Sequence, residues 1–141
     1  MSEQMITHEP AFLGFQGLKV WQLAMELVVL VRDFTEQLPN GEQHQITSQL
    51  RRASVSIPIN IAEGKGRNTS KDYAHFVAMA RGSACEVWTL LEICNRIKLG
   101  PDPSPCKAMA ERVMQMLWKL GGALTRDRPR RSATAIEQDR V

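Results

Sequence analysis

Residues 49–67 read QLRRASVSIPINIAEGKGR, and apolar residues recur along this segment and just before it every three or four positions. This spacing places them on one side of a helix and predicts a buried stripe. The stripe consists of Ile46, Leu50, Ala53, Ile57 and Ile61. Pro58 has no N–H to donate to the carbonyl of Ser54, so the sequence predicts a helix that kinks at Pro58.

The same helical winding places hydrogen-bonding side chains on a second stripe, which we call the polar seam. We expect the polar seam to recover the hydrogen bonds that Pro58 disturbs and to link this helix to the next one. Its expected members are Arg52, Ser56, Asn60 and Glu63, with Glu86 of the following helix as a further partner. The alternative is an active site in which Asn60 or Glu63 acts as the general base and the other residue orients the reactants.

Catalysis at the polar seam would also need a nucleophile or a metal ion within hydrogen-bond reach. Ser54 and Ser56 lack the G-x-S-x-G setting of a nucleophilic serine, and the 3 histidines lack the spacing of a metal site. Residues 64–69, GKGRNT, lack the spacing of a phosphate-binding loop. We therefore expect no enzyme activity, no catalytic, metal-binding or cofactor-binding residues, no cofactor and no small-molecule substrate.

On either side of this helix, further segments have helical spacing, with apolar stripes over residues 20–38, 73–94 and 106–124. Turn residues separate them at 39–41, 64–66 and 100–105, and Asn40 and residues 68–70 offer capping side chains. Short links between four helices predict an all-α, antiparallel up-down-up-down four-helix bundle. We expect a disordered or extended lead over residues 1–14, the bundle over 15–125 and a disordered basic tail over 126–141.

The first of these helices is apolar around more of its circumference than one bundle core needs. Its stripe already supplies Leu23, Leu27 and Phe34 to the core. Off that stripe lies a candidate oligomer interface made of Trp21, Met25 and Val28. Because an exposed apolar stripe usually marks an association surface, we expect a closed homo-oligomer.

The composition is that of one globular domain: 141 residues, of which 43% are hydrophobic and 23% are charged. The longest apolar run, residues 27–31, is far shorter than the roughly 18 residues of a membrane span. The first residues lack a basic segment followed by an apolar one, so we expect no signal peptide. Cys85, Cys94 and Cys106 are odd in number and lack metal-site spacing, which indicates reduced thiols. We expect a cytoplasmic protein without a membrane partner.

The net charge of +3 is only mildly basic. Basic side chains nevertheless gather at one edge of the second helix and near the end of the chain. The candidate nucleic-acid contacts are Arg51, Lys65, Arg67, Arg128, Arg130 and Arg131. Guanidinium groups match phosphate oxygens in pairs. The alternative is that Arg52 and Arg67 pair with Glu63 or Glu86 inside the chain.

Three segments resemble a known family: FQGLKVWQLAMELV at 15–28, the stretch at 49–67, and DYAHFVAMARGSACE at 72–86. They resemble the four-helix bundle family encoded in intervening sequences of bacterial large-subunit ribosomal RNA genes. The accessory variability determinant of diversity-generating retroelements is a relative of that family. Residues 60–64, NIAEG, carry the most specific part of the resemblance, which covers about Phe15 to Leu124.

The resemblance implies ring-like pentamers, and for the accessory protein it implies binding to nucleic acid and to a reverse transcriptase. Most family members have no assigned activity. We therefore carry two hypotheses: a non-catalytic, ring-forming scaffold or assembly protein, and an RNA-binding accessory factor that uses basic ring surfaces and the arginine-rich tail. The expected partners are further copies of the chain and, in the second hypothesis, nucleic acid or a nucleic-acid enzyme.

Overall fold

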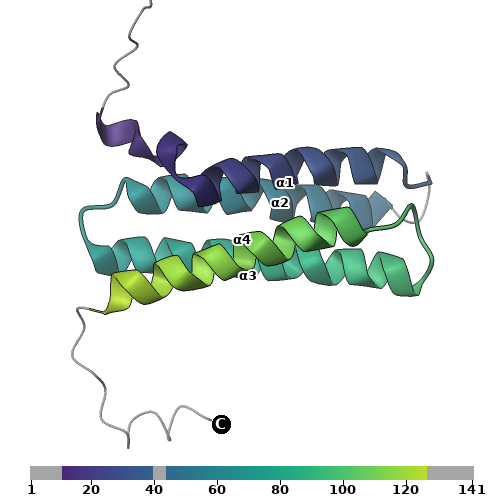
Figure 1. Ribbon diagram of the computed structural model, residues 1–141. Helices are drawn as coiled ribbons and strands as arrows, with labels where there is room; N and C mark the ends of the chain where they lie inside the picture. The colour runs from purple at the N-terminus through teal and green to yellow at the C-terminus, as the bar shows by residue number, and fades with distance from the viewer. Residues whose placement is uncertain (1–10, 40–43, 127–141) are drawn as a thin grey trace, which may run out of the picture.

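The computed structural model describes residues 11–39 and 44–126. A short 3-10 helix, η1 (Ala11–Gly17), leads into four α-helices. These are α1 (Lys19–Glu36), α2 (His44–Lys65), α3 (Ser70–Arg96) and α4 (Ser104–Thr125). Successive helices run in opposite directions, and α4 returns to pack against α1 (Figure 1). The predicted all-α four-helix bundle is confirmed, and the described ranges contain no strand.

The predicted apolar stripes form the core. Within α2, Leu50, Ile57 and Ile61 are fully buried, and Ala53 is almost so. The other helices face them with the large buried side chains Leu23, Leu27, Val31, Val77, Val87, Leu91, Val113 and Leu117. Burial of side chains of this size provides most of the driving force for folding. Among the described helices, none is long and apolar enough to cross a membrane.

Local sequence signals set the helix ends. Thr69 precedes α3, and its hydroxyl oxygen accepts a hydrogen bond from the backbone N–H of Asp72 at 3.1 Å, which confirms the predicted cap. The predicted cap at Asn40 lies outside the described residues. The loop between α3 and α4 turns through Gly100, whose φ of 81° favours glycine. Helix α4 begins at Ser104, within the predicted turn over residues 100–105, and has a proline in its first turn.

Helix α2 continues without interruption through Pro58 and ends at Lys65. The kink at Pro58 stays a prediction. Close to the end of this helix, Gly64 is buried against α3, where a Cβ atom would lie 2.8 Å from the Cβ of Phe76. The absence of a side chain at Gly64 therefore lets α2 and α3 approach closely.

Candidate functional site

An apolar groove lies between α1 and α2, with one residue of η1 in its lining, and we call it the α1–α2 groove. Its volume is about 360 Å³. The lining residues are Phe15, Trp21, Met25, Val28, Val55, Pro58, Ile59 and Ala62. Several of these side chains face solvent: Met25 and Val55 are each 42% exposed, and Ile59 is 53% exposed. The groove is thus an open apolar surface and not a closed part of the core.

The α1 wall of this groove consists of the three residues that the sequence identified. Trp21, Met25 and Val28 are spaced four and three positions apart, so they share one side of α1. The ring of Phe15 packs against Trp21 with centroids 5.5 Å apart. A hydrogen bond from Gln22 Nε2 to a backbone carbonyl of η1, 2.9 Å long, fastens η1 beside them. The structure therefore places the three predicted residues on one surface, and its role as an oligomer interface stays a prediction.

The α2 wall was missed by the sequence interpretation. Val55, Ile59 and Ala62 follow helical spacing and lie off the buried stripe, so this signal was present in the sequence. Pro58 belongs to the same wall and is itself buried. It removes a backbone donor from this side of the helix and presents an apolar ring in its place.

Among the described residues, the hydrogen bonds of the predicted polar seam lie within α2, and its link to α3 stays a prediction. Ser56 Oγ donates to the carbonyl of Ala53 at 2.7 Å, and Asn60 Nδ2 donates to the carbonyl of Ser56 at 2.8 Å, so both bonds stay within α2. The charged members of the polar seam are Arg52, Glu63 and Glu86. All three are exposed, and no ion pair joins any of them to another described residue. Water can solvate charged side chains at the surface of a bundle, so these three residues do not need to form ion pairs with one another.

The candidate nucleic-acid residues on α2 have different surroundings. Arg51 is half-buried, and its Nε donates to Thr35 Oγ1 of α1 at 2.9 Å. Lys65 lies over the ring of Tyr73 at 5.9 Å, and Arg67 lies over the ring of Phe76 at 4.5 Å. Among the described residues, Arg67 thus contacts an aromatic ring and makes no ion pair with Glu63 or Glu86, which was the alternative. Arg128, Arg130 and Arg131 lie outside the described residues.

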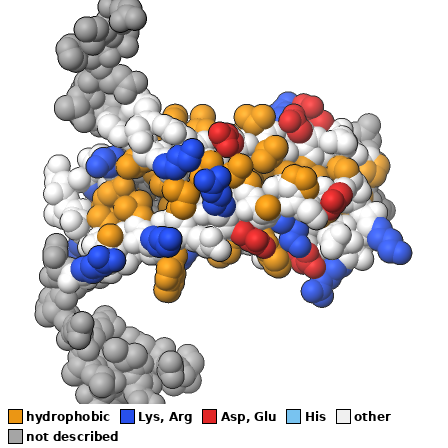
Figure 2. Space-filling view, in the orientation of Figure 1, with side chains coloured by type: hydrophobic (Ala, Val, Ile, Leu, Met, Phe, Trp, Pro, Cys, Tyr) orange, Lys and Arg blue, Asp and Glu red, His pale blue; other side chains and the backbone are white. Residues whose placement is uncertain are grey.

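Cations prevail at the end of the bundle where α1 and α3 begin and α2 and α4 end, and we call it the basic end. Its cationic residues are Lys19, Lys65, Arg67, Lys71, Lys119 and Arg126, and its acidic residues are Glu26, Glu63 and Asp72. On the face drawn in Figure 2, Lys and Arg side chains lie among apolar side chains at this end, whereas Asp and Glu side chains lie from the middle toward the opposite end, together with further Lys and Arg side chains. No ion pair joins two described residues of the basic end.

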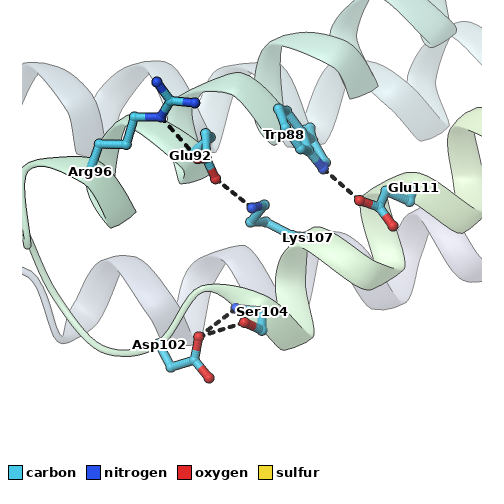
Figure 3. Close-up of polar contacts among 7 residues, drawn as sticks. All are labelled: Trp88, Glu92, Arg96, Asp102, Ser104, Lys107 and Glu111. Carbon is cyan, nitrogen blue, oxygen red and sulfur yellow. Dashed lines mark hydrogen bonds and ion pairs between the residues drawn. The ribbon is translucent and has the colours of Figure 1, made fainter.

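The opposite end carries a charge-paired network that joins α3 to α4 (Figure 3). Glu92 accepts hydrogen bonds from Lys107 of α4 and from Arg96 of α3, and these bonds hold the pKa of the Glu92 carboxyl below its usual range. Trp88 Nε1 donates to Glu111 at 2.9 Å, and Lys107 lies 4.7 Å over the Trp88 ring. These contacts hold α3 against α4, and the charged groups of the network are paired with one another.

Asp102 and the cysteines complete the ionisable groups that the structure perturbs. The Asp102 carboxylate accepts from the Ser104 hydroxyl at 2.7 Å and from the Ser104 N–H at 3.0 Å, which lowers the pKa of Asp102. Burial raises the pKa of the Cys94 and Cys106 thiols, whereas Cys85 is exposed. Within residues 11–39 and 44–126, no group of three or more His, Cys, Asp or Glu side chains could hold a metal ion.

Comparison with known proteins adds one finding. A family model described as 23S rRNA-intervening sequence protein matches residues 16–119, which include the α1–α2 groove apart from Phe15, most of the basic end and all of the charge-paired network. No curated protein matches the sequence.

Proposed function

The chain belongs to the 23S rRNA-intervening sequence protein family, and we propose that it is a non-catalytic assembly protein whose copies join through the α1–α2 groove. The observation that carries the proposal is the set of apolar side chains that face solvent there. Met25, Val55 and Ile59 are all more than two-fifths exposed and surround one groove. Contiguous apolar surface of this kind is rare on monomers and typical of interfaces.

The assembly that we propose is a closed ring, and five copies is the number that the family resemblance implies. Ring closure needs a heterologous contact, in which the groove of one copy receives a different surface of the next copy. In this proposal the chain acts as a scaffold, and the ring repeats each surface of the bundle at fixed positions. Binding energy at the interface would come from burial of the groove, at about 25 cal/mol for each Å² of apolar area.

A matched pair of substitutions tests the assembly proposal. Ile59→Lys places a charge in the α1–α2 groove, at a side chain that is 53% exposed. Ile97→Lys makes the same chemical change outside the groove, at a side chain that is 58% exposed. Multi-angle light scattering at micromolar concentration should give an oligomer for the unchanged chain and for Ile97→Lys, and a smaller particle for Ile59→Lys. A monomeric unchanged chain would defeat the proposal, whereas a dimer or tetramer would defeat only the pentamer.

A second candidate function is binding of nucleic acid or of a nucleic-acid enzyme, and the distribution of charge favours it. The cations of the basic end are not paired with carboxylates of described residues. Arg67 and Lys65 instead lie over aromatic rings, which leaves their N–H groups able to bond phosphate oxygens. A ring would repeat this basic end and add electrostatic contacts to a polyanion.

Fluorescence anisotropy with a structured RNA tests this second candidate. Affinity should fall steeply as the salt concentration rises, because phosphate contacts release counterions. Replacing both Lys65 and Arg67 with Gln should flatten the salt dependence, whereas replacing Arg32 and Arg96, which pair with carboxylates at the opposite end, should leave it unchanged. Absence of salt-dependent binding would reject nucleic acid as a partner.

A further inference from the structure

Trp118 of α4 is the most exposed large hydrophobic side chain among the described residues, at 67%. It lies outside the α1–α2 groove and outside the core. The guanidinium carbon of Arg81, on α3, lies 4.7 Å from the centre of the indole ring. Because the residue remains largely exposed despite this contact, most of the indole surface is open to solvent. Trp118 does not belong to the buried apolar stripe of α4, so packing of the core does not explain why a large apolar side chain is exposed at this position.

Two hollows on the surface between α3 and α4 share Trp118 and Arg81 as lining residues. The first has a volume of about 340 Å³, and the second has a volume of about 350 Å³. Ala74, Val77, Ala78, Gly121, Gly122 and Thr125 also line the first, and Cys85, Met114, Gln115 and Lys119 line the second. Small residues thus leave space beside the indole, and a Cβ atom added at Gly122 would meet no atom within 4 Å.

The charged residues that line this surface have one sign. Among the described residues, Arg81 and Lys119 are the only charged ones that line the two hollows. Beyond the first hollow, α4 ends and the chain continues to Arg126, at the basic end. Among the described residues, the carboxylates nearest along the two helices are Asp72 and Glu86 of α3 and Glu111 of α4, and none of them lines either hollow. An anionic ligand would therefore meet cations here and no competing carboxylate in the lining.

We propose that this surface binds single-stranded nucleic acid, with a base stacked on Trp118 and the adjoining phosphates held by Arg81 and Lys119. The inference rests on the second candidate function and assigns it a site. An aromatic face flanked by cations is the arrangement with which proteins hold unpaired bases, because every base offers a π-face and every linkage a phosphate. A duplex keeps its bases stacked on one another, so it could use the cations but not the indole.

The experiment compares a fluorescently labelled oligouridine of about 12 nucleotides with an RNA duplex of equal length, both titrated with the full chain in an anisotropy assay. Trp118→Ala should weaken binding of the single strand by about 5- to 100-fold, and Trp118→Phe should retain most of the affinity because it keeps an aromatic face. Met79→Ala removes another exposed apolar side chain from α3, outside both hollows, and should change nothing.

The charge contacts give a separate readout. Arg81→Gln and Lys119→Gln should each reduce the slope of log affinity against log salt by about 0.7, the value for one phosphate contact on a single strand. Binding of the duplex should be insensitive to Trp118→Ala. Light scattering on Trp118→Ala should give the mass of the unchanged chain, since the indole is assigned to the ligand and not to a contact between copies.

Three outcomes would overturn the inference. If the unchanged chain binds salt-dependently but Trp118→Ala binds the single strand equally well, the stacking site is wrong and the second candidate function stands. If Trp118→Ala has a smaller mass, the indole belongs to an interface between copies. If the unchanged chain binds neither probe at low salt, both the inference and the second candidate function fail.

Discussion

Replacement of Gly64 by alanine should destabilise the bundle, although alanine is the better helix former. In the interior of a helix, Gly→Ala normally stabilises by roughly 1 kcal/mol, and the gain at Gly64 is at most this, because Gly64 is one residue from the end of α2. At Gly64 the new Cβ would lie 2.8 Å from the Cβ of Phe76 and 2.9 Å from Cδ2 of Tyr73. The Phe76 Cβ is fixed to the backbone of α3, so the two helices must separate, which costs about 1–3 kcal/mol for an overpacked contact.

Gly82→Ala is the matched control, because Gly82 lies inside α3 and a Cβ there would meet no atom within 4 Å. This variant should gain roughly 0.5–1 kcal/mol from helix propensity alone. Only Gly64→Ala incurs the overpacking cost, so we expect its free energy of unfolding to be about 2 kcal/mol lower than that of Gly82→Ala. Urea unfolding followed by circular dichroism, at one fixed protein concentration, measures the difference. Equal stabilisation by both substitutions would refute the close approach of α2 and α3.

Two further predictions concern acid stability and the groove. Lys107 and Arg96 lower the pKa of the Glu92 carboxyl in the folded state. Its contribution to stability is therefore present above the ordinary carboxyl pKa and is lost as the pH falls through the lowered value. In thermal melts from neutral to acidic pH, the melting temperature of Glu92→Gln should fall less than that of the unsubstituted protein. An equal pH dependence for Glu92→Gln would contradict this. Pro58→Ala should keep the helix content, because it restores a backbone donor. It should reduce the mass measured by light scattering, because the proline ring is removed from the α1–α2 groove. An unchanged mass would exclude Pro58 from the interface.

The sequence predicted those features that depend on spacing along one helix. The stripe of Leu50, Ile57 and Ile61 is buried, and Thr69 caps α3, because burial periodicity and capping are local properties of the chain. The same reasoning found Trp21 and Met25, which lie off the buried stripe of their helix.

Features that depend on how neighbouring helices are rotated against one another were not predictable in this way. The contact of Arg51 with Thr35 joins α2 to α1, and the bond between Lys107 and Glu92 joins α4 to α3. The exposure of Glu63 depends on the same rotation: spacing placed it beside other polar residues, and in the structure it faces solvent. Trp118 also lies off its buried stripe, and the sequence analysis did not use this signal.

The α1–α2 groove and Trp118 lie on different sides of the bundle, because the helices contact one another in the cyclic order α1, α2, α3 and α4. A contact of groove against groove would be two-fold and would stop at a dimer, whereas a ring requires the groove to receive another surface. The exposed indole is the strongest competitor for that role, because Trp118 is the most exposed large hydrophobic side chain among the described residues. The mass of Trp118→Ala therefore tests both proposals together: an unchanged ring leaves the indole free to stack on a base, and a dissociated one makes Trp118 the surface that the groove receives.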